Sequence, residues 1–199
     1  MRIDDHIIRE DLLKVGDWVL DAGCLNFGLH KELGEKQCLI CIDPNKDIVA
    51  PPNVRMIRAA LGAGRGVAYY YSWGNGEGNH IAGTGTTPYW ATDKYEVQVY
   101  DIQSIMDMFH VKQFGLIKLD IEGSEYDVLL GIDQPIARQI AVEFHQQLGH
   151  NKYGTHEEYM DKLMASPFGR LYEIAEWERR ADYELYEYLF LLKGLAPLT

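Results

Sequence analysis

The chain has few cysteines, no long apolar run and a shortage of basic residues, and each absence excludes a class of protein. Three cysteines in 199 residues are too few, and odd in number, for the disulfide framework of a small secreted domain. No stretch approaches the ~20 consecutive apolar residues that span a bilayer, so we expect no membrane segment. Lys and Arg number 19 against 30 Asp and Glu and form no basic run that would bind a polyanion. A nucleic-acid partner is therefore not expected.

The first residues also lack the pattern of a secretory leader. The segment from Met1 to His6 has no basic stretch followed by an apolar core, and we therefore expect a cytoplasmic location. Cys38 and Cys41 have the C-x-x-C spacing of redox and metal sites, but they lie in an apolar run without a second pair. We interpret both as small hydrophobic residues of a buried strand.

The remaining composition is that of an ordinary globular protein. Hydrophobic residues make up 47% and charged residues 25%, and 199 residues suit one domain with a sizeable core. We therefore expect residues 1–199 to form a single domain. The net charge of -11 favours small neutral or cationic ligands.

Apolar segments with alternating periodicities predict strands and helices in turn. We predict a helix over 5–15 within an N-terminal segment that ends at Gly16, a strand over 18–21, a helix over 27–33 and a strand over 37–43. The last three form a strand–helix–strand unit of ~30 residues, which is typical of parallel sheets.

The rest of the chain continues this alternation. Ser124 and Asp127 resemble a capping box at the start of a helix. Further strands are predicted at 54–61, 67–72, 97–102, 116–121 and 139–145, and helices at 104–110, 124–130 and 156–164. The segments 171–178 and 184–192, joined by a turn over 179–183, predict an antiparallel hairpin. The expected fold is α/β: a Rossmann-like doubly wound, mostly parallel sheet with a C-terminal antiparallel hairpin.

A glycine-rich segment interrupts the pattern between 73 and 87. We interpret 73–96 as an insertion that is either a lid over a binding site or a surface loop.

Acidic residues end the first two predicted strands, where α/β sheets bind their ligands. Asp43 comes 22 positions after Asp21, the usual spacing for a carboxylate that accepts ribose hydroxyls. The loop Gly23–Gly28 lacks the G-x-G-x-x-G of dinucleotide sites, and Asp21 would repel a phosphate. S-adenosylmethionine carries positive charge and no phosphate, which favours it here; alternatively, Asp21 only accepts local backbone hydrogen bonds.

Three stretches of the chain resemble the FkbM-type methyltransferases. Residues 15–23 are similar to that family's first strand and motif I, and Asp43-Pro44-Asn45 is similar to the end of its second strand. The stretch 117–125 matches its signature Ile-Lys-x-Asp-x-Glu-Gly-x-Glu. The resemblance extends, with gaps, from about Gly16 to His145 and implies the class I methyltransferase fold with S-adenosylmethionine as cofactor.

The resemblance also implies roles for individual residues. Asp21, Gly23 and Asn26 of the first loop would border the methionine end, and Asp43 would accept the ribose hydroxyls. Ala60 and Leu61 would lie near the adenine, and Asp120 beside the reacting centre. Glu122 and Ser124 are equally well explained by turn formation and helix N-terminal charge.

Transfer of a methyl group to a hydroxyl also requires a base. His145 is the first candidate, because imidazole titrates near neutral pH, and Asp120 is the second. Glu143 lies two residues before His145, so both point to one face of a strand; a hydrogen-bonded structural histidine is the alternative. We assign no metal, although Asp120, Glu143 and His145 form an acceptable divalent-cation set. Lys118, inside an apolar strand, requires a carboxylate partner or a route to solvent.

The resemblance implies an O-methyltransferase that acts on a small-molecule or glycan hydroxyl. Two other classes stay open: a non-catalytic module that keeps the nucleoside-binding fold, and an NAD-linked oxidoreductase, which the missing glycine spacing disfavours. The sequence carries no signal for an oligomeric state.

Overall fold

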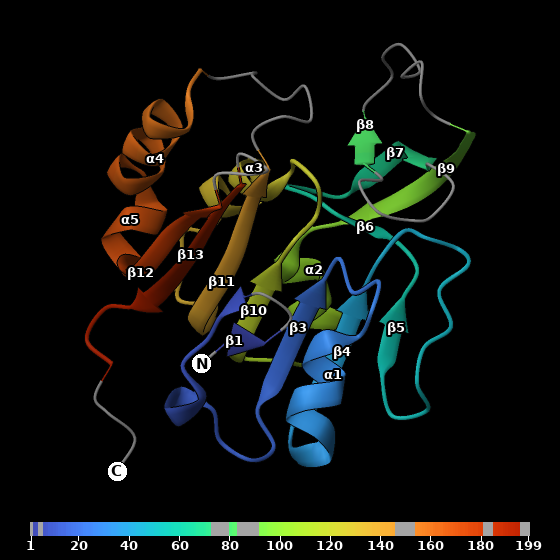
Figure 1. The fold of residues 1–199 in the computed structure, drawn as a ribbon, viewed down its shortest axis with the longest axis horizontal. Coiled ribbons are helices and arrows are strands. Elements are labelled where there is room, and N and C mark those ends of the chain that lie inside the picture. Colours follow the sequence, from blue (N-terminus) through green and yellow to red (C-terminus); the bar gives the residue numbers. More distant parts are fainter. Residues whose placement is uncertain are drawn as a thin grey trace.

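A central sheet of seven strands organises the computed structural model (Figure 1). The structure describes residues 2–3, 6–72, 80–82 (backbone only), 92–145, 154–180 and 185–195. The strands, in spatial order, are β12 (Tyr172–Arg180), β13 (Leu185–Leu192), β11 (Ala137–His145), β10 (Phe114–Leu119), β3 (Trp18–Ala22), β4 (Cys38–Ile42) and β5 (Arg55–Ile57). β5, β4, β3, β10 and β11 are parallel, whereas β13 is antiparallel to both β11 and β12. The expected mostly parallel sheet with a C-terminal antiparallel hairpin is confirmed.

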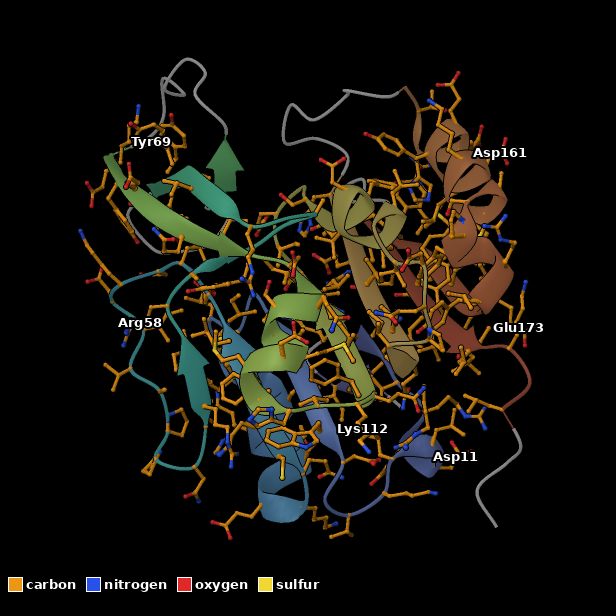
Figure 2. All side chains as sticks on the ribbon, turned by 180° about the vertical axis from the view of Figure 1, so that it is seen from behind. Asp11, Arg58, Tyr69, Lys112, Asp161 and Glu173 are labelled. Atoms are coloured by element: carbon orange, nitrogen blue, oxygen red, sulfur yellow. The ribbon has the colours of Figure 1, made fainter. Side chains whose placement is uncertain are left out.

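Helices cover both faces of this sheet, as a doubly wound fold requires. One face carries α1 (Gly28–Leu33), which continues into the 3₁₀ turn η2 (Gly34–Lys36). The other carries α2 (Ile102–Phe109), α3 (Glu125–Leu130), α4 (His156–Ala165) and α5 (Pro167–Leu171). Figure 2 shows α2 and α3 in front of the sheet when the molecule is seen from behind. Among the described helices, none combines the length and apolar character needed to cross a bilayer.

The strands alternate their side chains between two apolar cores. Leu20, Ile40 and Ile117 pack toward α2 and α3, whereas Val19 and Leu116 pack toward α1. Each such fully buried side chain contributes about 1.5–3 kcal/mol. On the α1 face the apolar residues give way to charged ones toward the carboxyl ends of the strands, so that face carries the site.

A second sheet lies beyond the carboxyl ends of β4 and β5 (Figure 1). It contains β6 (Ala60–Leu61), β9 (Asp93–Tyr100), β7 (Gly66–Ser72) and β8 (His80–Ala82). The prediction of one strand over 54–61 is wrong, because the chain leaves the large sheet after Ile57 and enters the small one at Ala60. Arg58 holds this break by donating to the Ile48 carbonyl at 2.7 Å. Of the predicted insertion, 73–79 and 83–91 lie outside the described residues.

The predicted N-terminal helix is also wrong. The described part of this segment forms β1 (Arg2–Ile3), which pairs with β2 (His6–Ile7), and a short 3₁₀ turn, η1 (Glu10–Leu12). His6, Ile7 and Ile8 are consecutive and all buried, which one face of a surface helix does not allow. Contacts with the sheet therefore override the local helical spacing.

Two smaller predictions concern single side chains. Ser124 precedes α3, but its side chain makes no capping hydrogen bond, so the predicted capping box with Asp127 is wrong. Cys38 and Cys41 lie three residues apart in β4 and therefore face opposite sides of the sheet, and both are free. Their C-x-x-C spacing creates no pair.

Candidate active site

Lys118 and Asp21 form a buried ion pair near the carboxyl ends of β10 and β3. The two residues are direct neighbours across the parallel ladder, so their side chains project from the same face. Lys118 Nζ lies 3.4 Å from Asp21 Oδ1 and 3.2 Å from Asp120 Oδ2, and it donates to the Gly23 carbonyl at 2.6 Å. Burial raises the pKa of Asp21, and the charge of Lys118 opposes this. The expected carboxylate partner of Lys118 is confirmed.

Gly23 brings the loop after β3 against the end of β10. Its φ is +78°, and a Cβ there would lie 1.7 Å from the backbone carbonyl oxygen of Asp120, so only glycine fits. The Gly23 N–H also donates to the Ile42 carbonyl at 3.0 Å. The ends of β3, β4 and β10 are thus joined at one point.

Asp43 follows β4 at this same edge of the sheet. Its side chain is buried, and Oδ1 accepts a hydrogen bond from the Asn45 amide at 2.8 Å. Burial raises the pKa of Asp43 to about 6. Of the other predicted cofactor residues, Asn26 is exposed before α1, and Ala60 and Leu61 are buried in β6.

Five ionisable side chains converge where β10 and β11 end, and we call them the His145 cluster: Asp120, Glu122, Glu125, Glu143 and His145. The imidazole Nε2 lies 3.1 Å from Glu143 Oε1, 3.3 Å from Glu122 Oε2 and 3.7 Å from Asp120 Oδ1. The side chains of Asp120 and Glu122 are 28% and 25% exposed, against 8% for His145. The cluster therefore opens to solvent at two carboxylates and is closed around the imidazole.

Glu125 holds both the imidazole and the turn beside it. Its carboxylate accepts hydrogen bonds from the backbone N–H groups of Ile121 and Gly123 and lies 3.1 Å from His145 Nδ1. The turn places Glu122 in the left-handed region at φ 58°, which turns its side chain back toward His145. Glu125 is fully buried and is thus an internal brace for the site.

A second layer lies behind the cluster. Glu187 on β13 is in register with Glu143 on β11, so their side chains share a face. His6 bridges this layer to the front, with Nδ1 3.2 Å from Glu187 Oε2 and Nε2 3.8 Å from Asp120 Oδ2. Burial raises the pKa of Glu187 to about 7. Burial would lower the pKa of His6, but Asp120 and Glu187 raise it to about 9.

The crowding of carboxylates shifts the titration of the cluster itself. Burial would lower the pKa of His145, but hydrogen bonds to Glu125 and Glu143 raise it well above its usual value. Burial would raise the pKa of Glu143, but its hydrogen bond to His145 lowers it to about 2. Burial raises the pKa of Glu122 to about 7. The carboxylates around the ring thus favour its protonated form.

Asp120, Glu122 and His145 could also hold a metal ion. Each offers one ligand atom, and these atoms lie within 4.8 Å of one another. Glu143, which the sequence-based alternative used in place of Glu122, instead lies between His145 and Arg180, whose Nη1 is 3.5 Å from Glu143 Oε2. A separate pocket of about 220 Å³ between α2 and α3 is lined by none of the predicted site residues.

Comparison with known protein families decides which class of enzyme this site belongs to. The family described as Methyltransferase FkbM domain matches residues 17–185, which include β3 through most of the sheet and the whole His145 cluster. The chain belongs to the FkbM methyltransferase family. A comparison with curated protein sequences yields no significant match.

Solved structures similar to this FkbM methyltransferase include two other methyltransferases. One is a TehB-like SAM-dependent methyltransferase from Corynebacterium glutamicum, 13% identical, with a TM-score of 0.44 over 92% of this chain and 83% of the other. The second is a variant of a 16S rRNA (adenine(1408)-N(1))-methyltransferase from Catenulisporales acidiphilia, 10% identical. Its TM-score is 0.44, over 96% of this chain and 90% of the other.

The FkbM signature at 117–125 supplies much of the site. It contributes Lys118, Asp120, Glu122 and Glu125. The three carboxylates lie 3.1–3.7 Å from the His145 ring, and Lys118 contacts Asp120. Sequence reasoning selected Asp120 and left Glu122 open, and it missed Glu125. The spacing Glu-Gly-x-Glu was the available signal, because a turn with glycine brings its two flanking carboxylates back together.

Proposed function

We propose that this FkbM methyltransferase transfers the methyl group of S-adenosylmethionine to a hydroxyl of a sugar or another small metabolite. The observation that carries the proposal is the buried carboxylate of Asp43, located at the same sheet edge as the Gly23 loop and the His145 cluster. A ribose acceptor at the same sheet edge as potential proton acceptors is the arrangement that methyl transfer from a nucleoside requires, and this supports the proposal.

The residues at this edge fit such a cofactor. Asp43 has the chemistry to accept hydrogen bonds from the two ribose hydroxyls, and no phosphate has to be accommodated among these carboxylates. Asp120 is partly exposed next to Gly23 and suits the ammonium and sulfonium charges. Asp21 is turned inward to Lys118, so we now propose that it supports the loop from behind rather than contacting the cofactor.

The chemistry is divided between positioning and proton transfer. When bound, S-adenosylmethionine supplies an electrophilic methyl group on a sulfonium, which leaves sulfur for the hydroxyl oxygen. Gly23 and Asp43 fix the direction of attack, since alignment accounts for much of the barrier in such a displacement. The hydroxyl proton passes to a carboxylate beside His145. Glu122 suits this role better than Glu143, because burial raises the pKa of Glu122 to about 7 whereas the pKa of Glu143 is about 2. The imidazole keeps these carboxylates in place.

The proposed chemical class of the acceptor follows from the net charge of the chain. The net charge of -11 opposes polyanionic acceptors and favours a neutral or cationic molecule. A sugar or small-metabolite hydroxyl satisfies this condition and is accessible to a site whose exposed groups are Asp120 and Glu122.

Calorimetric titration tests the cofactor first. We expect S-adenosylmethionine and its demethylated product to bind, and NAD not to bind. Asp43→Asn should weaken binding about 10- to 100-fold, because a hydrogen bond to a charged group contributes about 1.5–3 kcal/mol. Asp161→Asn on the exposed surface of α4 (Figure 2) is the matched control and should leave the affinity unchanged. Binding of NAD in preference to S-adenosylmethionine would refute the proposal. If S-adenosylmethionine binds as expected, turnover is measured with a panel of hydroxylated acceptors.

A further inference from the structure

One imidazole nitrogen faces three carboxylates in the His145 cluster. Nε2 is 3.1–3.7 Å from oxygens of Asp120, Glu122 and Glu143, and one N–H serves only one of them with good geometry. Like charges this close in a partly buried site repel each other with little screening. Asp120, Glu122 and His145 thus present two carboxylate oxygens and one nitrogen, within 4.8 Å of one another, to a common point.

The imidazole is oriented as a metal ligand would be. Its Nδ1 faces Glu125 at 3.1 Å, and Glu125 is itself held by two backbone N–H groups and fully buried. In metal sites a ligating histidine commonly gives its second ring N–H to a carboxylate, which fixes the tautomer and aims the other nitrogen at the ion. The brace at Glu125 therefore directs Nε2 into the cluster, where a bound ion would take the place of the Nε2 proton.

Glu187 adds a further buried carboxylate behind the cluster, and His6 Nδ1 faces its Oε2 at 3.2 Å. Glu187 is fully buried beside Glu143, and neither of its carboxylate oxygens accepts a hydrogen bond within the described residues. A buried carboxylate is costly unless positive charge lies close by. Among the described residues of this region, carboxylates outnumber basic groups: Lys118, Arg180, His6 and His145 stand against Asp21, Asp120, Glu122, Glu125, Glu143 and Glu187.

We propose that Asp120, Glu122 and His145 bind one divalent cation of the Mn²⁺ type. Mixed oxygen and imidazole ligation suits such an ion better than Ca²⁺, which prefers oxygen throughout, or structural Zn²⁺, which prefers nitrogen and sulfur. Glu125 orients the imidazole, and Glu143 with Glu187 adds negative charge from the second layer. This assignment differs from the sequence-based expectation of no metal, because the sequence did not place Glu122 with the other two.

The role of the cation follows from exposure and rests on the proposed function. Asp120 and Glu122 are about one quarter exposed, so the remaining coordination positions face solvent rather than the protein interior. An acceptor hydroxyl that occupies such a position has its pKa lowered by the cation. A neighbouring carboxylate would take the hydroxyl proton, and the oxygen would accept the methyl group. The cation would thereby select acceptors with a hydroxyl able to reach it.

Binding of Mn²⁺ alone to the metal-free protein tests the assignment without any turnover. Titration with MnCl₂, followed by calorimetry and by the electron paramagnetic resonance signal of free Mn²⁺, should give one site per chain. Glu122→Gln and His145→Ala, which come from different elements, should each weaken it at least about tenfold. Glu173→Gln should leave it unchanged, because Glu173 is exposed (Figure 2) and pairs with Leu191, at the opposite end of β13 from the residue that pairs with His145. Far-ultraviolet circular dichroism verifies that each variant folds, and the second site variant keeps the test valid if one does not.

The outcomes separate this proposal from the proposed function. No saturable Mn²⁺ binding, or binding equal in wild type and both site variants, overturns the cation site. Titration with S-adenosylmethionine in the presence of a chelator is carried out in parallel, so that cofactor binding is measured without the cation. Cofactor binding without a Mn²⁺ site overturns the cation alone, whereas a Mn²⁺ site without cofactor binding overturns the methyl-transfer role and leaves the cation in place.

Discussion

Lys118 Nζ lies 3.4 Å from Asp21 Oδ1 within the central sheet, where the two side chains are 1% and 2% exposed. Removing two charges from water is expensive, and the pair is tolerated because Lys118 also contacts Asp120 and the Gly23 carbonyl. The pair thus ties the first loop to the end of β10. The pair matters for stability mainly because removing one partner would leave the other buried without a counter-charge.

Lys118→Met should therefore destabilise the protein by about 3–5 kcal/mol, since it leaves Asp21 buried without a counter-charge. Lys118→Met with Asp21→Leu should recover much of this loss. Urea denaturation measures both. Lys46→Met is the control, because the Lys46–Asp93 pair is 57% and 48% exposed and should contribute little to stability. Equal losses at the buried and exposed lysines would contradict this account.

Gly23→Ala should abolish cofactor binding and destabilise the fold. The new Cβ meets the Asp120 carbonyl at 1.7 Å, and the residue must also keep φ at +78°. Gly16→Ala provides the comparison, because Gly16 has φ +85° with no atom within 4 Å of the added carbon. That variant should lose only the about 1–2 kcal/mol of a left-handed alanine. Thermal unfolding and calorimetric titration compare the two, and similar behaviour would mean that the close approach at Gly23 has no effect.

The affinity for S-adenosylmethionine should rise with pH between 5 and 7. Burial raises the pKa of Asp43 to about 6, so the group is mostly protonated at pH 5 and mostly a carboxylate at pH 7. Only the carboxylate accepts from both ribose hydroxyls, so binding at pH 5 should be about tenfold weaker than at pH 7. Calorimetry across this range measures the slope. Asp43→Asn should bind weakly with little slope, and a wild-type slope that survives this substitution would assign it to another group.

His6 and Glu187 should be energetically coupled. His6→Leu leaves a fully buried carboxylate without its facing ring and should cost about 1–3 kcal/mol. Glu187→Leu in the same chain should remove most of that penalty, giving a coupling energy of about 0.5–3 kcal/mol in a double-mutant cycle. Strictly additive losses in guanidinium denaturation would mean that the 3.2 Å approach carries no interaction.

The fold could be predicted where local pattern and tertiary role agree. The apolar runs that became β3, β4, β10 and β11 are buried on both faces, as parallel strands require, and the C-terminal segments lacked a helix between them. The N-terminal helix failed because β2 is held by contacts with the sheet. The strand over 54–61 failed because nothing in its apolar pattern marks the point at Arg58 where the chain changes sheets.

Only the site residues that lie at strand ends could be predicted from the sequence. Asp43, Asp120, Glu143 and His145 end strands, and strand ends can be read from sequence. His6 and Glu187 were missed because β2 and β13 bring them to Asp120 and Glu143 through pairings distant in sequence. No spacing rule links such residues.

The placement of β13 between β11 and β12 has a consequence for how the enzyme matures. Glu187 reaches Glu143 only when this late strand inserts against β11, and His6 meets Glu187 only after that. During synthesis on the ribosome, β3 and β4, which end at the proposed nucleoside site, therefore emerge long before β13 supplies Glu187. The proposed function then predicts that a nascent chain gains cofactor affinity before Glu187 and His6 complete the layer behind the His145 cluster.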